Sequence, residues 1–401
     1  MKPLSVYVHI PFCTRKCGYC DFNVYAGLGR LKGAYANAVV AEVEAWREVL
    51  AARRVVSVAF GGGTPGEMPP DAIAAILDAI CATADVAPDA EVTLEANPGT
   101  TSGEAFRALR AAGVNRLSLG AQSFHADELR FLDRIHAADA IEASVRLARD
   151  AGFDNVNLDL IYGLPGQSGD RWLASLNRAL VLAPEHLSLY ALTVEEQTPL
   201  AVRIRRGLVD EPDPDLAANL YELATGTLAA AGYEQYELSN WCRPGYRSRH
   251  NLAYWTDREY VGLGAGAHGY LDGVRYENVA HPREYVRRCA GAGVRRPYVA
   301  ASTQHAPVFA TDAAEWVALR LRLLEGFRPE EFEARFGCTL ADLAGRALAR
   351  CEQDGIIEWA GGRLHLTRRG RLFHGEVAAR VLAEARQKVA RMEVAAPSAG
   401  G

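Results

Sequence analysis

Cys13-Thr14-Arg15-Lys16-Cys17-Gly18-Tyr19-Cys20 gathers three of the chain's eight cysteines into eight residues. The β-branched and aromatic run Ser5–Ile10 precedes it and stops at Pro11, which predicts a strand that leads into a loop. Thiolates gathered on one loop suit zinc or an iron–sulfur cluster. A structural zinc site is closed by four ligands, usually as two pairs, and the nearby further donor is His9 alone. The spacing therefore favours a cubane cluster with one open iron, and three ordinary reduced cysteines are the remaining alternative.

Beyond this loop, strand and helix patterns alternate. Strands are predicted at 55–60, 91–95, 115–119, 155–160, 186–192 and 233–238, and the apolar spacing between Leu31 and Leu50 predicts a helix. A βα series of this kind makes a parallel sheet or barrel, whose ligands collect at the carboxyl ends of the strands. Unusual residues follow those ends, namely Gly61–Gly63, Glu95, Gln122 and Asp159.

Composition narrows the class of protein. The 401 residues are 49% hydrophobic and 23% charged, which excludes disorder for most of the chain. The 44 basic and 49 acidic residues give a net charge of −5, so no global field favours nucleic acid or an anionic membrane. The chain has few cysteines for its length, and its N-terminus lacks the apolar run of a signal peptide, which predicts a cytoplasmic protein. Its apolar stretches are too short for a membrane-spanning helix, so at most peripheral membrane contact is expected.

The last ninety or so residues follow a different pattern. Helices at 313–324 and 340–353, followed by strands around the turn Gly361-Gly362, predict a winged-helix-like module. Such modules often bind DNA, and a DNA-binding regulator is one functional alternative. From residue 312 onward, however, 14 Lys and Arg stand against 13 Asp and Glu, so no basic stripe is present. A lid or packing role is favoured over DNA binding.

With an aromatic residue directly before its third cysteine, Cys13-x-x-x-Cys17-x-Tyr19-Cys20 resembles the signature of radical S-adenosylmethionine (SAM) enzymes. Further motifs resemble the oxygen-independent coproporphyrinogen III oxidase group: Tyr7–Cys13, Gly61–Pro65, Glu95–Pro98, Gly120–Phe124 and Asp159–Pro165. The resemblance implies an α/β fold, a partial (β/α)6-type radical SAM barrel with a C-terminal winged-helix-like α+β module. It also implies a [4Fe-4S] cluster on Cys13, Cys17 and Cys20, and SAM contacts from Tyr7, Tyr19, Gly62, Gly63, Thr64, Glu95, Gln122, Arg134 and Asp159.

Several of these residues have a physical reading of their own. A glycine run lets a backbone approach a ligand closely, or only makes a tight turn. Glu95 and Asp159 could accept hydrogen bonds from ribose hydroxyls or an amino group, or cap a helix. Gln122 and Arg134, taken without the resemblance, would be ordinary surface polar residues.

Two departures separate the chain from the oxidase. The oxidase pattern has a further cysteine two positions after the third ligand, where Phe22 stands here, and it has a longer arm before the first strand. Instead, His250-Asn251-Leu252-Ala253-Tyr254-Trp255 resembles the heme-associated H-N-x-x-Y-W motif of the HemW branch, described as heme chaperones. His250 could ligate heme iron while Tyr254 and Trp255 offer flat apolar faces. The alternative is a core histidine with two packing aromatics.

The resemblance leads to two functional hypotheses. The first is a heme chaperone that binds a [4Fe-4S] cluster, SAM and heme, and transfers heme to an acceptor protein, with a reductant protein as electron donor. The second is the coproporphyrinogen III oxidase reaction or another radical SAM reaction on a tetrapyrrole.

The predicted organisation is a barrel over 1–235, an extension with the H-N-x-x-Y-W motif over 236–305, the winged-helix-like domain over 306–392 and a flexible tail over 393–401. Gly264-Ala265-Gly266-Ala267-His268-Gly269 fits G-x-G-x-x-G, but the following residues 270–276 predict a hairpin rather than the helix that a dinucleotide site requires. These glycines are expected near the SAM site, with His268 as a secondary ligand candidate.

Overall fold

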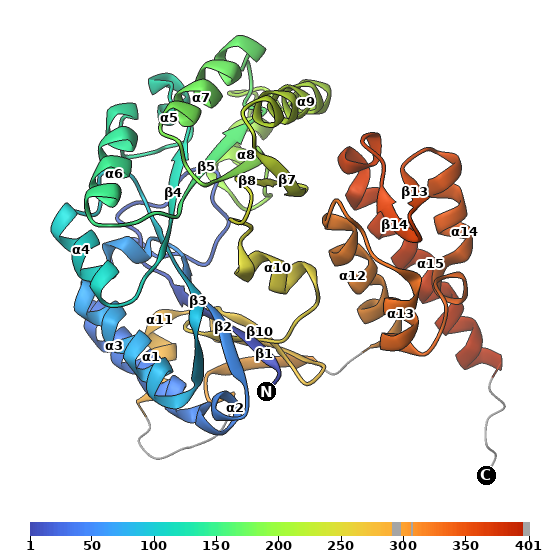
Figure 1. The fold of residues 1–401 in the computed structure, drawn as a ribbon, viewed down its shortest axis with the longest axis horizontal. Coiled ribbons are helices and arrows are strands. Elements are labelled where there is room, and N and C mark those ends of the chain that lie inside the picture. Colours follow the sequence, from blue (N-terminus) through green and yellow to red (C-terminus); the bar gives the residue numbers. More distant parts are fainter. Residues whose placement is uncertain (291–297, 306–307, 396–401) are drawn as a thin grey trace. The chain divides into compact units, whose positions relative to one another are not determined.

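The strand predicted ahead of the cysteine loop is β1 (Pro3–Ile10), which pairs in parallel with β2 (Arg54–Gly62) on one side and β9 (Tyr260–Leu263) on the other. In the computed structural model, which describes residues 1–290, 298–305 and 308–395, these strands belong to a twelve-stranded sheet (Figure 1). The strand order is β12-β11-β10-β9-β1-β2-β3-β4-β5-β6-β8-β7. Its remaining strands are β3 (Asp85–Ala96), β4 (Arg116–Gln122), β5 (Val156–Tyr162), β6 (His186–Ala191), β7 (Glu234–Glu237), β8 (Asn240–Cys242), β10 (His268–Leu271), β11 (Val274–Asn278) and β12 (Ala301–His305).

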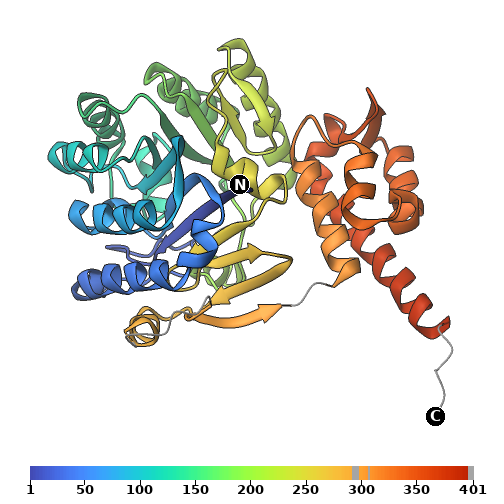
Figure 2. The same cartoon turned by 60° about the horizontal axis from the view of Figure 1, so that its bottom comes forward.

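Strands β1 to β6 are consecutive, parallel neighbours, as the βα rhythm predicts. Figures 1 and 2 show the helices that connect them on the outer face of the curved sheet. These and the later helices of the sheet's unit are α1 (Lys32–Ala45), α2 (Arg47–Ala51), α3 (Pro70–Thr83), α4 (Gly103–Ala111), α5 (Ala126–Phe131), α6 (Ala138–Asp150), α7 (Gly169–Val181), α8 (Pro199–Arg205), α9 (Pro214–Ala230) and α11 (Pro282–Cys289).

Two predictions from the rhythm are wrong in detail. The strand expected at 233–238 forms as β7, but β8 lies between it and β6 and runs antiparallel to β6, so the parallel series ends at β6. The single helix expected between Leu31 and Leu50 is two helices, α1 and α2, with a break at Trp46. Trp46 is fully buried and stacks on Tyr276 of β11, so packing against a distant strand fixes that residue outside the helical conformation.

By its contacts the chain divides into two compact units. The barrel unit comprises Met1–Glu234, Ser239–His250 and Arg258–His305, and the C-terminal unit comprises Gln235–Leu238, Asn251–Asp257 and Ala306–Gly401. The segment 236–305 therefore supplies strands to the same sheet as the first 235 residues. It also contains α10 (Arg249–Trp255), whose first two residues belong to the barrel unit and the rest to the C-terminal unit. The β10–β11 hairpin expected after the Gly264–Gly269 run is present.

The C-terminal unit contains the predicted helices and hairpin. Helices α12 (Phe309–Arg322) and α14 (Leu340–Gln353) precede the antiparallel pair β13 (Ile357–Ala360) and β14 (Arg363–Leu366). Gly361 and Gly362 both take positive φ in the turn between these strands. The sequence interpretation missed α13 (Pro329–Phe336) and α15 (His374–Ala395). Residues 393–395 of the expected tail end α15, and residues 396–401 lie outside the described residues.

The parallel strands have one apolar and one polar face. Apolar residues at alternate positions, such as Val8, Phe60 and Leu94, are buried in the core formed with the helices. The other face carries polar residues that hydrogen-bond across strands: Ser57 Oγ donates to Ser5 Oγ (2.8 Å), and Asn157 Nδ2 donates to Ser118 Oγ (2.7 Å). Because the helices cover the outer face, the polar face lines the interior enclosed by the curved sheet.

Candidate functional site

The cysteine loop leaves β1 at the carboxyl edge of the parallel strands. Its two ends are joined, because Tyr25 N donates to Pro11 O (2.8 Å) and Cys13 N donates to Tyr25 O (3.4 Å). All three cysteines are free thiols of intermediate exposure. Burial raises the pKa of Cys13 to about 11 and also raises that of Cys20, so bound metal would have to displace their protons. Within the described ranges, no three His, Cys, Asp or Glu side chains are grouped so as to hold a metal ion.

The glycine run after β2 is fastened to the start of the cysteine loop. Gly63 N donates to Ile10 O and Thr64 N to Phe12 O, both at 2.8 Å. The Thr64 hydroxyl lies 3.4 Å from Cys13 Sγ. A Cβ on Gly63 would lie 2.6 Å from Phe12 O and 2.7 Å from Ile10 O. Glycine at this position is therefore required for two chain segments to lie side by side, and the close approach to a ligand stays a prediction.

Glu95 lies at the end of β3, where it faces the glycine run. Its Oε2 accepts a hydrogen bond from Gly62 N (3.1 Å), and Gly62 takes φ +104°. Glu95 is an exposed residue, but it lies on the interior face of the barrel, where its carboxylate is partly desolvated. This desolvation raises its pKa to about 7, and the nearby Asp159 carboxylate adds to the increase. Glu95 is thus an acceptor whose protonation state a cationic ligand would change.

Arg134 connects the cysteine loop to two strand ends. Its Nη1 donates to Cys17 Sγ (3.6 Å) and its Nη2 to Gly120 O (2.8 Å), and the guanidinium also contacts the Asn97 side chain. Asn97 Nδ2 in turn donates to the Thr64 hydroxyl (2.9 Å). The sequence interpretation did not assign Asn97, although the residue stands inside the Glu95–Pro98 motif.

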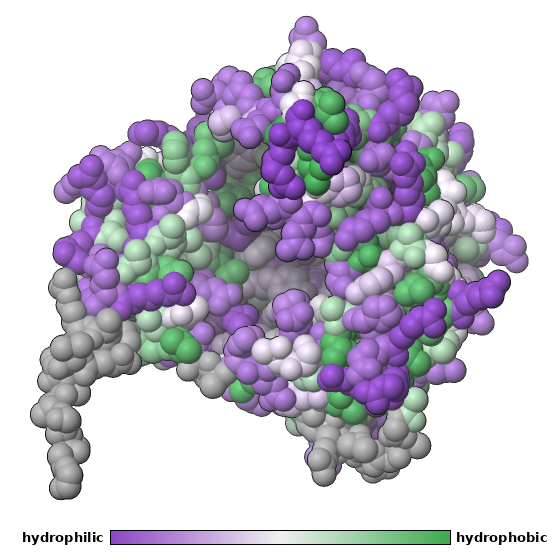
Figure 3. Space-filling view, turned by 180° about the vertical axis from the view of Figure 1, so that it is seen from behind, coloured by the Kyte–Doolittle hydropathy of each residue, from purple (hydrophilic) through white to green (hydrophobic). Residues whose placement is uncertain are grey.

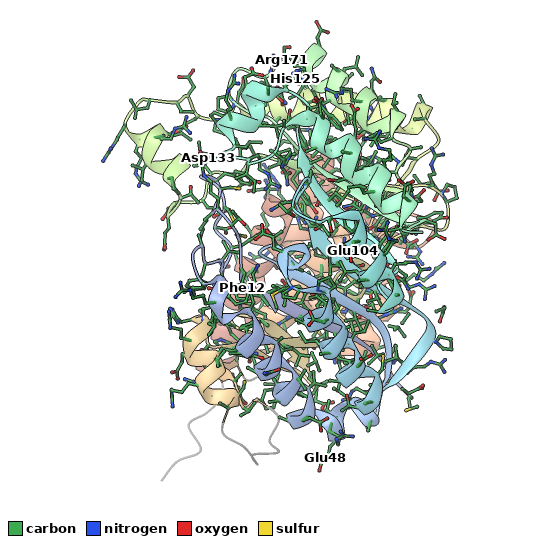
Figure 4. All side chains as sticks on the ribbon, turned by 90° about the vertical axis from the view of Figure 1, so that its left-hand side faces the viewer. Phe12, Glu48, Glu104, His125, Asp133 and Arg171 are labelled. Carbon is green, nitrogen blue, oxygen red and sulfur yellow. The ribbon has the colours of Figure 1, made fainter. Side chains whose placement is uncertain are left out.

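The segment that carries Arg134 makes a second contact with the loop. Arg15 pairs with Asp133 at 2.8 Å, and Asp133 takes φ +55°. In Figure 4 Asp133 and Phe12 are labelled on the side of the barrel unit where the cysteine loop lies, whereas Glu48 and Glu104 lie on the outer helices. The loop is therefore held on both sides, by the glycine run and by the 133–134 segment.

Gln122 has an unusual conformation and an unsatisfied atom. It is a non-glycine residue with φ +65°, which is strained, and its buried Oε1 has no hydrogen-bond partner among the residues that the structure describes. An unpaired buried acceptor is rare in proteins. The Gln122 side chain is therefore suited to accept a hydrogen bond from a bound molecule.

Asp159 and Tyr7 complete the predicted set inside the barrel. Asp159 accepts hydrogen bonds from Ser118 Oγ (3.1 Å) and Asn157 Nδ2 (2.7 Å), and burial raises its pKa. Tyr7 Oη is paired with His9 Nδ1 (3.1 Å), and His9 Nε2 lies 3.0 Å from Asn23 O in the cysteine loop. Tyr19, in that loop, is partly buried against a small apolar cluster that includes Leu132.

The residues of the H-N-x-x-Y-W motif fall into both units. His250, in the barrel unit, is 5% exposed, and its Nδ1 lies 3.0 Å from Ser57 Oγ. Burial lowers its pKa to about 4. Tyr254 and Trp255 belong to the C-terminal unit, where the Arg322 guanidinium lies 4.2 Å above the Trp255 ring. His250 is thus buried as the core alternative expects, with a serine hydroxyl as a partner, and heme ligation stays a prediction.

The Gly264–Gly269 run lies beside the end of β1, and a buried glutamate holds it there. Glu42 accepts hydrogen bonds from Gly264 N (2.8 Å), Tyr285 Oη (2.6 Å) and Asn278 Nδ2 (2.8 Å). Tyr35 Oη donates to His9 O and accepts from Ala265 N, both at 2.7 Å. His268 is exposed on β10. These bonds hold the Gly264–Gly269 run against the end of β1.

Glu42 gives a prediction on stability. Burial raises its pKa to about 7, above the value in the unfolded chain. The stabilisation by its bound proton is therefore complete below about pH 4.5 and is lost as the pH rises through about 7. Between these pH values we expect the free energy of unfolding of the native protein to fall relative to Glu42→Gln by about 2 kcal/mol, measured by urea denaturation. Glu44→Gln on the same helix is the control, and parallel pH profiles for the native protein and Glu42→Gln would contradict the argument.

Comparison with known proteins identifies the family. Residues 7–179 match the model of the radical SAM superfamily, and residues 310–373 match that of the HemN C-terminal domain. The heme chaperone HemW of Mycobacterium tuberculosis is 43% identical over 375 residues, which cover 93% of each chain. The chain belongs to the HemW family. The Escherichia coli HemW heme chaperone is 36% identical over 96% of this chain and 99% of its own length.

The fold of this HemW family member also matches a solved structure. Escherichia coli coproporphyrinogen III oxidase (HemN), described as a radical SAM enzyme, superimposes with a TM-score of 0.81 over 95% of this chain and 90% of that one, at 24% identity. The shared fold confirms the predicted α/β barrel and C-terminal domain. In the described part of the chain, no helix is both long enough and apolar enough to cross a membrane. The face in Figure 3 is mainly hydrophilic, with hydrophobic residues in small scattered patches.

Proposed function

We propose that this protein is a heme chaperone that holds a [4Fe-4S] cluster and SAM in the barrel unit, and that it transfers heme to an acceptor protein in the cytoplasm. The observation that carries the proposal is the convergence of the cysteine loop, the glycine run and Arg134 at one edge of the sheet, in a chain whose full-length relatives are HemW proteins. A reductant protein as electron donor, and no nucleic acid, belong to the same proposal.

Cys13, Cys17 and Cys20 would hold the cluster. Three free thiols on one short loop match the ligand set of a cubane that keeps one iron for SAM. Bound there, the cluster would supply SAM with one electron. Arg134 places its guanidinium against Cys17 Sγ, and Thr64 its hydroxyl against Cys13 Sγ, which stabilises the negative charge of the thiolates.

The strand ends would hold SAM. Gly62 and Gly63 bring backbone close to the loop, and Glu95 and Asp159 are acceptors for hydroxyl or ammonium groups. Gln122 offers its unpaired Oε1. Tyr7 lies within the electrostatic influence of Glu95, and the Asp159 carboxylate accepts hydrogen bonds from Ser118 and Asn157. Together with Thr64 and Tyr19 these residues would enclose the nucleoside and amino acid parts of SAM.

For heme, the proposal relies on His250, Tyr254 and Trp255. Because His250 is 5% exposed, its ring can reach heme iron only if the first turn of α10 moves away from β2 and β3. We therefore expect heme binding to be slower than a diffusion-limited encounter. Ser57→Ala removes a hydrogen-bond partner of the buried His250 ring. We expect this variant to bind heme at a higher rate than the native protein.

Heme titration tests the proposal. The reconstituted protein should shift the Soret band of heme, and the double variant His250→Ala with Trp255→Ala should bind at least about tenfold more weakly, since it lacks the ligand and one apolar face. Trp359→Ala, at an exposed tryptophan of β13, serves as control. Transfer is then measured as the gain of heme absorbance by a separately purified acceptor apoprotein.

Two results would overturn this proposal. One is the absence of a Soret shift with the intact protein, and the other is equal heme affinity in the double variant, which would remove the motif from the site. Formation of protoporphyrinogen IX from coproporphyrinogen III under anoxia, with reductant and SAM, would instead support the oxidase reaction.

A further inference from the structure

A buried positive charge inside the barrel has no role in the proposed function. Arg116 lies on β4 beside Thr93 of β3 and is 4% exposed. Its Nε is buried without a hydrogen-bond partner in the part of the chain that the structure describes. A guanidinium stays protonated in proteins, so Arg116 is a fixed cation in the barrel interior. Such a group is costly to bury and calls for a charge that compensates it.

Two carboxylates on the neighbouring strands interact with Arg116 through their charge. Glu95 stands two residues after Thr93 on β3, opposite Ser118, and Asp159 is hydrogen-bonded to that same Ser118. Burial raises the pKa of both carboxyls, and the repulsion from Asp159 raises that of Glu95 further. Arg116 acts in the opposite direction on both, since its positive charge favours their ionised forms.

Other titratable and charged groups also face this interior. Burial lowers the pKa of His186 and His250, so both imidazoles are neutral near pH 7. The Glu91 carboxylate accepts hydrogen bonds from Ser248 Oγ, Arg249 N and His250 N. The remaining groups on the surrounding elements are Tyr7 and His9 of β1, Cys242 of β8 and Arg134 after α5.

We infer that Arg116 is a positioning residue, whose charge favours the joint ionisation of Glu95 and Asp159 so that the barrel interior holds a cationic ligand near neutral pH. Glu91, Glu95 and Asp159 outnumber Arg116 and Arg134, so the interior attracts a cation and repels an anion. SAM carries an ammonium and a sulfonium group and is a ligand of this kind. The choice of ligand rests on the proposed function, whereas the effect of Arg116 on the two carboxylates does not.

The first experiment needs no ligand. Infrared spectra of the apoprotein report protonated carboxylic acids by their carbonyl stretch, and we compare the native protein with Arg116→Gln and Arg116→Lys over pH. In Arg116→Gln the protonated signal should persist to about one pH unit higher, because the stabilising charge is gone. Arg116→Lys keeps the charge and should titrate like the native protein. The inference fails if Arg116→Gln titrates like the native protein, or if Arg116→Lys titrates like Arg116→Gln.

A double variant assigns the effect to the carboxylate pair. In Arg116→Gln with Asp159→Asn, the repulsion on Glu95 is also removed, so the protonated signal should return toward its native pH range. This variant also buries one charge fewer than Arg116→Gln, so it is expected to be the more stable of the two. If the infrared signal of protonated carboxyls stayed at the higher pH range in the double variant, Arg116 would not act on the Glu95 and Asp159 pair.

The second experiment measures SAM affinity of the reconstituted protein by equilibrium dialysis. For Arg116→Gln we expect affinity about three- to tenfold below native at about pH 6.5, with recovery above about pH 8.5, where the carboxyls ionise without help. A loss by the same factor at every pH would mean a merely structural role and would overturn the inference. If the native protein binds no SAM, the proposed function fails, while the infrared titration still decides the role of Arg116.

Discussion

Cys17→Ser is expected to abolish the iron–sulfur chromophore and, with it, SAM binding. A serine hydroxyl is a hard, weakly acidic ligand that replaces a soft thiolate poorly, and Cys13 and Cys20 alone leave the cluster short of ligands. Arg134 also loses its sulfur partner. We expect SAM affinity to fall by about a hundredfold or more, measured by equilibrium dialysis beside iron and sulfide analysis.

Cys81→Ser is the matched control for this prediction. Cys81 is exposed on α3, away from the cysteine loop, so its variant should keep the visible spectrum and SAM affinity of the native protein. If Cys17→Ser retained full iron content and SAM affinity, a ligand set other than Cys13, Cys17 and Cys20 would operate.

Gly63→Ala is expected to cause nearly as large a loss of SAM affinity, although it removes no side chain proposed to bind the cluster or SAM. The new Cβ would lie 2.6 Å from Phe12 O and 2.7 Å from Ile10 O, and these are backbone atoms that cannot turn aside. Relief requires the glycine run and the cysteine loop to separate, which breaks the bonds from Gly63 N and Thr64 N. We expect destabilisation of about 2 kcal/mol in urea denaturation, and a loss of SAM affinity of about tenfold or more.

The control is Gly33→Ala in the first turn of α1, where a Cβ meets nothing within 4 Å. Alanine in a helix is more favourable than glycine, so this variant should be as stable as the native protein or slightly more so. Native SAM affinity in a stable Gly63→Ala protein would show that the close approach of the two segments is not needed for the site.

The elements that were predicted correctly have strong local signals. The strand before the cysteine loop, the five strands that follow it in parallel and the C-terminal hairpin each combine a clear periodicity with a Gly, Pro or polar stop. The break at Trp46 and the antiparallel β8 were not predictable in this way. Trp46 leaves the helix because it packs on Tyr276, more than two hundred residues away, and β8 is a strand of three residues, too short for a pattern.

The candidate site was predictable to a similar degree. The cysteine spacing by itself indicates a metal group, and the glycine run by itself indicates a close backbone approach. Gln122 and Arg134, by contrast, could be assigned only through the family resemblance. The structure shows an unpaired buried acceptor on Gln122 and bonds from Arg134 to Cys17 and Gly120, while their contact with SAM stays a prediction.

The sequence by itself determined the cysteine loop, the parallel order of the strands and the alternation of polar and apolar residues along them. In β4, for example, Arg116 and Ser118 alternate with Leu117 and Leu119. Alternation shows that a strand has two different faces, but it does not show which face is enclosed. Only the tertiary structure decided that the polar faces point inward, because the helices bury the apolar faces on the outside and the sheet curves around the others. That closure turns Arg116, Glu95 and Asp159, which would be ordinary solvated charges on an open sheet, into interacting charges of one interior.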